Sequence, residues 1–260
     1  MGYVAALLIG LSLGLIGGGG SILTVPVLVY FFGVSPVMAT SYSLFIVGST
    51  SLVGSVNSVR QGWVNFKTVL IFGLPSIITV FFIRRTVIGL LPSSFVVGGY
   101  TLSLAVITMI LFALLMLFSA MGMIKRNDYS DTHQIPTLTN SKLLFYGLSV
   151  GLVTGFLGAG GGFLLIPALT LGARLPMKTA IGTSLVIISI NSITGFLADT
   201  GHFDIQWRLL IIISLIAIVG VFAGGRLAQK IQSDRLRKGF GWFVLLTGIA
   251  VIIQQLQMLL

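Results

Sequence analysis

The sequence is poor in charge and contains neither cysteine nor glutamate. Only 8% of its 260 residues are charged, and all five acidic residues are aspartates. The absence of cysteine excludes disulfides, thiol catalysis and thiolate metal sites. Because there are also only two histidines, hydrolytic or metal catalysis has almost no side chains to use. We therefore expect no enzyme activity and no cofactor.

The composition that remains is typical of an integral membrane protein. Hydrophobic residues make up 56% of the chain and the mean hydropathy is +1.10, whereas soluble domains carry about 25% charged residues. Charge is absent from five long stretches, namely 1–59, 86–124, 143–173, 179–198 and 239–260. About 20 apolar residues cross a bilayer, so we predict an all-α polytopic membrane protein that contacts lipid. The net charge of +10 then reflects basic loops under the positive-inside rule, and no nucleic acid is expected.

An internal repeat divides the chain. Shifted by 141 residues, Gly10–Gly54 aligns with Gly151–Gly195. The identical pairs include Gly14/Gly155, Gly17/Gly158, Gly19/Gly160, Gly20/Gly161, Leu23/Leu164, Pro26/Pro167, Ala39/Ala180, Ser43/Ser184 and Leu44/Leu185. We predict a first transmembrane repeat in residues 1–124, a polar linker in 125–142 and a second transmembrane repeat in 143–260.

Two of about eight hydrophobic segments are unusually long and rich in glycine. The segments are approximately 2–32, 36–59, 68–83, 93–124, 143–173, 179–198, 209–225 and 239–260. The first contains four consecutive glycines (17–20), and the fifth contains Gly-Ala-Gly-Gly-Gly at 158–162. Because glycine destabilises a helix by about 1 kcal/mol relative to alanine, we expect segments 1 and 5 to be broken at these runs.

The basic residues discriminate between two topologies. If all eight segments span the membrane, the 15 Lys and Arg divide 6 against 9 between its faces. If segments 1 and 5 instead enter and return as hairpins, one face holds only Arg84, Arg85 and Arg208, and the other holds twelve. The second division obeys the positive-inside rule better. It gives three spans per half and therefore inverted repeats, with both termini outside the cell.

The glycine breaks are also the strongest indication of a binding site. A helix that starts after such a break presents free N–H groups and the positive end of its dipole to an anion. The apolar segments contain no central cation, so we expect backbone dipoles to hold a small anionic substrate. The predicted substrate-binding residues lie at the two breaks and at polar positions of segments 2 and 6: Gly17, Gly18, Gly19, Gly20, Ser21, Ser43, Gly158, Gly160, Gly161, Gly162, Thr183, Ser184 and Asn191.

Simpler interpretations exist for several of these residues. The pairs Gly10/Gly14, Gly151/Gly155 and Gly220/Gly224 have the spacing of close helix packing. Buried hydroxyls often bond to their own helix, and Lys178 either attracts anions or extends to the interface. None of the five aspartates lies within an apolar segment. Proton coupling through a buried carboxylate is therefore not expected, and neither is a metal site.

The two glycine motifs resemble those of a known family. The sequences GLIGGGGSILTVP (14–26), GFLGAGGGFLLIP (155–167) and AIGTSL (180–185) are similar to the TauE/SafE family of sulfite and organosulfonate exporters. The resemblance covers nearly the whole chain, but Tyr42 stands where the second repeat has Thr183, and Ser21 aligns with Gly162.

The resemblance implies a secondary transporter in the bacterial inner membrane. It would move a small sulfur-containing anion such as sulfite, an organosulfonate or a similar oxyanion, by export through alternating access. No nucleotide-binding motif is present, so an ion gradient with a coupling ion or a partner protein would drive it. A homo-oligomer is compatible with the sequence. A non-transporting membrane scaffold or assembly protein and an anion channel are the competing interpretations.

Overall fold

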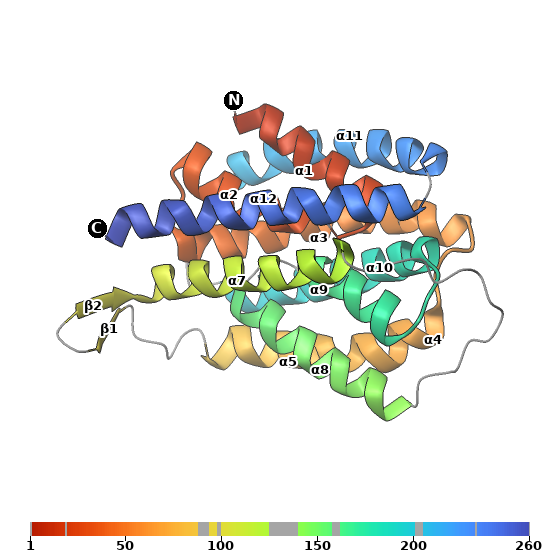
Figure 1. The fold of residues 1–260 in the computed structure, drawn as a ribbon, viewed down its shortest axis with the longest axis horizontal. Coiled ribbons are helices and arrows are strands. Elements are labelled where there is room, and N and C mark those ends of the chain that lie inside the picture. Colours follow the sequence, from red (N-terminus) through yellow and green to blue (C-terminus); the bar gives the residue numbers. More distant parts are fainter. Residues whose placement is uncertain are drawn as a thin grey trace.

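The computed structural model describes residues 2–18, 20–87, 94–97, 100–124, 140–157, 162–200, 205–231 and 233–259. The chain is a bundle of helices whose axes lie roughly along its longest dimension (Figure 1). The prediction of an all-α polytopic membrane protein is confirmed. The strands of the described part form one short antiparallel hairpin, β1 (Ser94–Val97) with β2 (Tyr100–Ser103), in which Ser94 pairs with Ser103.

The first half contains a broken hairpin and three longer helical stretches. Its elements are α1 (Gly2–Ile16), α2 (Gly20–Phe32), α3 (Pro36–Arg60), α4 (Phe66–Thr68), the π-helices η1 (Val69–Gly73) and η2 (Ile83–Val87) on either side of α5 (Leu74–Phe82), and α7 (Leu104–Ile124). The stretch from α4 to η2 is one continuous span of 22 residues. The side chain of Asn65 begins this span by accepting a hydrogen bond from the Thr68 N–H at 3.0 Å.

The second half repeats this order. Its elements are α8 (Asn140–Leu157), α9 (Gly162–Pro167), η3 (Ala168–Gly172), α10 (Met177–Asp199), α11 (Trp207–Lys230) and α12 (Ser233–Leu259). By position in the repeat, α3 corresponds to α10, the α5 span to α11, and α7 to α12. The predicted first boundary, at 124, coincides with the end of α7, whereas α8 begins at Asn140, inside the predicted linker 125–142. Residues 125–139 lie outside the described part.

The helical segments on either side of each glycine run are antiparallel. Helix α1 ends where Gly17 takes a φ of +75°, in the left-handed region that glycine adopts without strain. Helix α2 then runs antiparallel to α1, because Gly20 packs against Leu13 while Gly2 packs against Phe32. In the second half, η3 likewise returns along α8, since Gly172 lies against Tyr146. The hairpin topology with inverted halves is therefore confirmed.

The molecule has two ends, which we name after one residue at each. The Asp199 end contains the start of α1, the start of α3, the end of η2 and the end of α10. The Trp63 end contains the opposite ends of α3 and α10, the start of α8 and the end of α11. Figure 1 shows the β1–β2 hairpin and the end of α12 at one end of the long axis and α4 at the other.

Each hairpin packs mainly on a helix of the other half. Gly10 and Gly14 of α1 lie against Ala217 and Val221 of α11, so closely that a Cβ atom at either glycine would collide with backbone. Helix α8 packs in the same manner on the α5 span, where Gly147 meets Phe72. Close helix packing at the Gly10/Gly14, Gly151/Gly155 and Gly220/Gly224 pairs is thus confirmed.

Candidate functional site

The two glycine breaks meet inside the bundle. A Cβ atom on Gly162 would lie 2.7 Å from both the Cα and the carbonyl oxygen of Gly18, so two backbones pass each other here with no room for a side chain. Gly17, Gly18, Gly20 and Gly162 are all buried. Four predicted site residues at these breaks, Gly19, Gly158, Gly160 and Gly161, lie outside the described residues.

Serine hydroxyls from two helices donate hydrogen bonds to backbone carbonyls at the first break. Ser184 of α10 donates to the Gly17 carbonyl at 2.9 Å, and Ser21 donates to the Gly18 carbonyl at 2.8 Å. Both side chains are fully buried. Ser43, which aligns with Ser184 in the repeat, is also fully buried, and its Oγ has no hydrogen-bond partner among the described residues. The structure thus brings Ser21 and Ser184 to the breaks.

Two other predicted site residues lie elsewhere. The Thr183 Oγ1 accepts a hydrogen bond from the Asn65 N–H at 3.0 Å, at the Trp63 end. The Asn191 Nδ2 donates to the Ser76 Oγ at 2.7 Å and so joins α10 to α5, while the buried Asn191 Oδ1 has no partner among the residues that the structure describes. Thr50, the repeat counterpart of Asn191, donates to the Ile46 carbonyl of its own helix at 2.6 Å. At Thr50 the simpler interpretation, a hydroxyl bonded within its own helix, holds.

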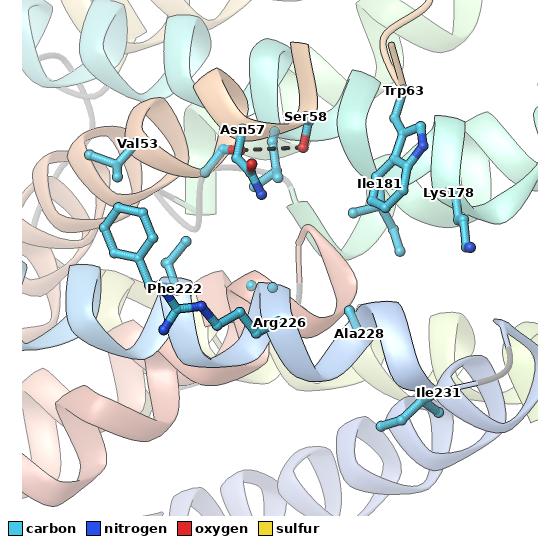
Figure 2. Close-up of a pocket in the computed structure, with 15 residues that line it drawn as sticks. Val53, Asn57, Ser58, Trp63, Lys178, Ile181, Phe222, Arg226, Ala228 and Ile231 are labelled. Carbon is cyan, nitrogen blue, oxygen red and sulfur yellow. Dashed lines mark hydrogen bonds between the residues drawn. The ribbon is translucent and has the colours of Figure 1, made fainter. Parts of the chain in front are cut away.

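A cavity of about 380 Å³ opens at the Trp63 end beside the first break. Its walls come from α1, α3, α10 and α11, and Lys178 and Arg226 supply its two cationic side chains (Figure 2). None of the described residues that line it is acidic. The lining residue Ile181 lies directly against Gly17, so the cavity extends to the wall of the glycine break.

The two cations of the cavity are held differently. The Lys178 Nζ lies 5.5 Å from the centre of the Trp63 ring, a cation–π arrangement that keeps the ammonium at the cavity. The Arg226 side chain comes from α11 and runs beside Phe222 in Figure 2. Asn57 adds an amide on the α3 wall. Cationic walls without a nearby carboxylate attract anions and repel cations.

A second polar cluster, at the Asp199 end, corrects the sequence analysis. The Arg84 Nη1 donates to the Asp199 Oδ2 at 2.8 Å and to the Thr40 Oγ1 at 3.2 Å, and Ser41 donates to the same carboxylate oxygen at 2.5 Å. Arg84 and Asp199 are only 2% and 5% exposed. The expectations of no buried carboxylate and of no cation inside the bundle were therefore wrong.

The reason for this error is the position of both residues at helix ends. Asp199 is the last residue of α10, and Arg84 is followed by the exposed Arg85, so each is expected at an interface. The hairpin topology could have predicted the pair, however, because it places Arg84 and Asp199 at the same end of the molecule. Opposite charges that terminate neighbouring apolar segments on one face can pair when helices pack together.

Comparisons with known proteins agree on one family. The family model described as "Sulfite exporter TauE/SafE" matches residues 3–251. The chain is 30% identical over 251 residues to a "Probable membrane transporter protein" of Xylella fastidiosa, covering 94% of this chain and 91% of the relative. It is 28% identical to the "Probable membrane transporter protein YunE" of Bacillus subtilis, covering 89% of each chain. No solved structure matches the chain.

Proposed function

The chain belongs to the sulfite exporter TauE/SafE family of membrane transporters, and from that premise we propose that it exports a small sulfur-containing oxyanion, such as sulfite or an organosulfonate. The observation that carries this proposal is the cavity with Lys178 and Arg226 on its walls and no described carboxylate. A carboxylate at this place would repel an anion, and two cations raise its local concentration.

The route we propose runs from the cavity to the glycine breaks. An anion that enters between Lys178 and Arg226 reaches Ile181, behind which lies Gly17. The first N–H groups of α2 begin at Gly20 and are free of intrahelical partners, as at any helix start. The buried Ser43 hydroxyl, whose Oγ lacks a partner among the described residues, offers a further donor. The two halves would then move against each other to alternate access.

The orientation in the membrane follows from the basic residues and is part of this proposal. Among the described Lys and Arg, Arg84, Arg85 and Arg208 lie at the Asp199 end, and the other ten lie at the Trp63 end. The positive-inside rule then places the Trp63 end, and with it the cavity, in the cytoplasm of the inner membrane. An anion from the cytoplasm can therefore enter the cavity, which agrees with export.

Labelling of introduced cysteines tests this orientation. Because the chain has no cysteine, Ser35→Cys reports on the Asp199 end and Ser141→Cys on the Trp63 end, and both serines are exposed. We expect an impermeant maleimide added to intact cells to label Ser35→Cys and to leave Ser141→Cys unlabelled until the membrane is opened. The reverse pattern would overturn the cytoplasmic position of the cavity.

Transport in reconstituted vesicles tests the function itself. We expect labelled sulfite to exchange across wild-type vesicles with saturation. The variant Lys178→Gln/Arg226→Gln should raise KM by roughly thirtyfold, because each of the two lost charged contacts is worth about 1 kcal/mol or more. Lys230→Gln is the matched control, since it removes a charge from the same helix outside the cavity lining. Vesicles that pass no sulfur oxyanion under any gradient would contradict the proposal, and non-saturable flux would indicate a channel.

A further inference from the structure

The buried Arg84 guanidinium has one edge whose donors are unpaired among the described residues. Its Nη1 donates to Asp199 and Thr40, but its Nε and Nη2 are buried and have no hydrogen-bond partner in the described part of the chain. Buried donors of a charged group are costly to leave unpaired, and most proteins avoid this. The Nε–Nη2 edge is also the geometry that binds two oxygens of one oxyanion at the same time.

The internal repeat aligns residues of the Arg84 cluster with residues that line the cavity. The shift of 141 residues takes Thr40 to Ile181 and Ser58 to Asp199. Arg84 lies near the end of the α5 span, and Arg226 lies near the end of α11, its counterpart in the second half. Ile181, Ser58 and Arg226 all line the cavity at the Trp63 end. The Arg84 cluster is thus the cavity's counterpart at the opposite end of the molecule.

The two places differ in the residue that corresponds to Asp199. At the Asp199 end the arginine pairs with a carboxylate from the other half, and the cluster is buried. At the Trp63 end the corresponding residue is Ser58, whose hydroxyl donates only to the Gly54 carbonyl of its own helix, at 3.3 Å (Figure 2). Arg226 is exposed there and has no carboxylate partner among the described residues, and the cavity is open.

We propose that Arg84 is a second oxyanion-binding residue, at the Asp199 end, and that Asp199 holds its guanidinium while this end is closed. The inference rests on the proposed function, because it assigns the transported oxyanion a contact on the far side of the glycine breaks. Arg84 and Thr40 come from the first half and Asp199 from the second. Opening this end separates the two halves, and the oxyanion then reaches the unpaired Nε–Nη2 edge of Arg84.

Two variants distinguish oxyanion binding from a purely structural ion pair. Arg84→Gln/Asp199→Asn removes both charges, so no unpaired charge is left buried and the fold is retained. Arg84→Lys keeps the positive charge and its attraction to Asp199 but lacks the two-donor edge. If Arg84 binds the oxyanion, both variants raise KM for sulfite at least about tenfold, the loss expected for a charged hydrogen-bonded pair. If the pair is only structural, both variants keep the wild-type KM.

Arg85→Gln is the matched control, because it removes an exposed charge from the neighbouring residue at the same end. Its KM is expected to stay within about twofold of wild type, since exposed charges contribute little. Wild-type KM in the double variant or in Arg84→Lys would overturn the proposal. Should the double variant fail to fold, Arg84→Lys alone decides.

A binding measurement separates this inference from the proposed transport. Sulfite that binds only the folded protein raises its Tm. We expect sulfite to raise the Tm of purified Lys178→Gln/Arg226→Gln protein, which retains Arg84, and not to raise it once Arg84→Gln/Asp199→Asn is added. If sulfite raises the Tm but the protein does not transport sulfite, the Arg84 site is supported and the transport proposal is contradicted. No sulfite-dependent rise with Arg84 present would overturn the site.

Discussion

Asp199→Asn alone should destabilise the protein more than any other single polar substitution in the described bundle. The amide keeps the size of the side chain but removes the negative charge that compensates Arg84, which is 2% exposed. Breaking a buried ion pair by removing one partner typically costs about 3–5 kcal/mol. Within a membrane span an uncompensated arginine is expensive for the same reason. We expect a markedly lower Tm and little monodisperse protein in detergent.

The double variant Arg84→Gln/Asp199→Asn is the internal control for this prediction. It removes the second charge as well, so its Tm should recover most of the loss caused by Asp199→Asn. Thermal unfolding of membrane proteins is often irreversible, so Tm values are compared at one scan rate. An Asp199→Asn protein with the Tm of wild type would show that Arg84 has another counter-charge.

Gly18→Ala should disrupt the crossing of the two broken hairpins. The added methyl group would collide with the carbonyl oxygen of Gly162, which is a backbone atom, so no flexible side chain can move aside. Overpacking of a filled core costs about 1–3 kcal/mol and sometimes more. Because the crossing lies between the halves that must move, we expect sulfite exchange in vesicles to be lost even where folded protein can be purified.

Gly122→Ala is the matched control for this variant. Gly122 is a helical glycine of α7, and no atom of another described segment lies within 4 Å of the position that a Cβ would take. The substitution should leave Tm and exchange unchanged, or raise Tm slightly, because alanine favours a helix more than glycine does. Equal behaviour of Gly18→Ala and Gly122→Ala would contradict the tight crossing of the breaks.

The sequence predicts the architecture well because its signals are local and repeated. Four consecutive glycines break a helix wherever they occur, and the positions of Arg84, Arg85 and Arg208 select the hairpin topology without knowledge of any contact. The repeat then predicts the inverted second half. At the breaks, Ser184 donates a hydrogen bond to Gly17, which is 167 residues away in the sequence. Its alignment with Ser43 in the repeat predicts it as a site residue.

The parts that could not be predicted depend on which helix faces meet. Thr183 directly precedes Ser184 in the sequence, but successive side chains of a helix point about 100° apart. Thr183 therefore accepts a hydrogen bond from Asn65 instead. Arg84 and Asp199 are separated by 115 residues, and each looks like an interface residue. The cavity likewise requires four helix ends to be placed together. Such contacts are properties of packing and not of any one segment.

The interlocked packing of α1 on α11 also sets the order in which the protein can be completed during synthesis. Gly10 and its neighbour Ala217 are about 200 residues apart, and ribosomes add about 5–20 residues per second. The α1–α2 hairpin therefore emerges roughly 10–40 s before α11 can cover its glycine face. During that interval the small-residue face of α1 must be covered by lipid, by the insertion machinery or by other helices of the first half. Variants that weaken the α1–α11 contact should therefore be degraded after synthesis, when α1 and α11 fail to pack together.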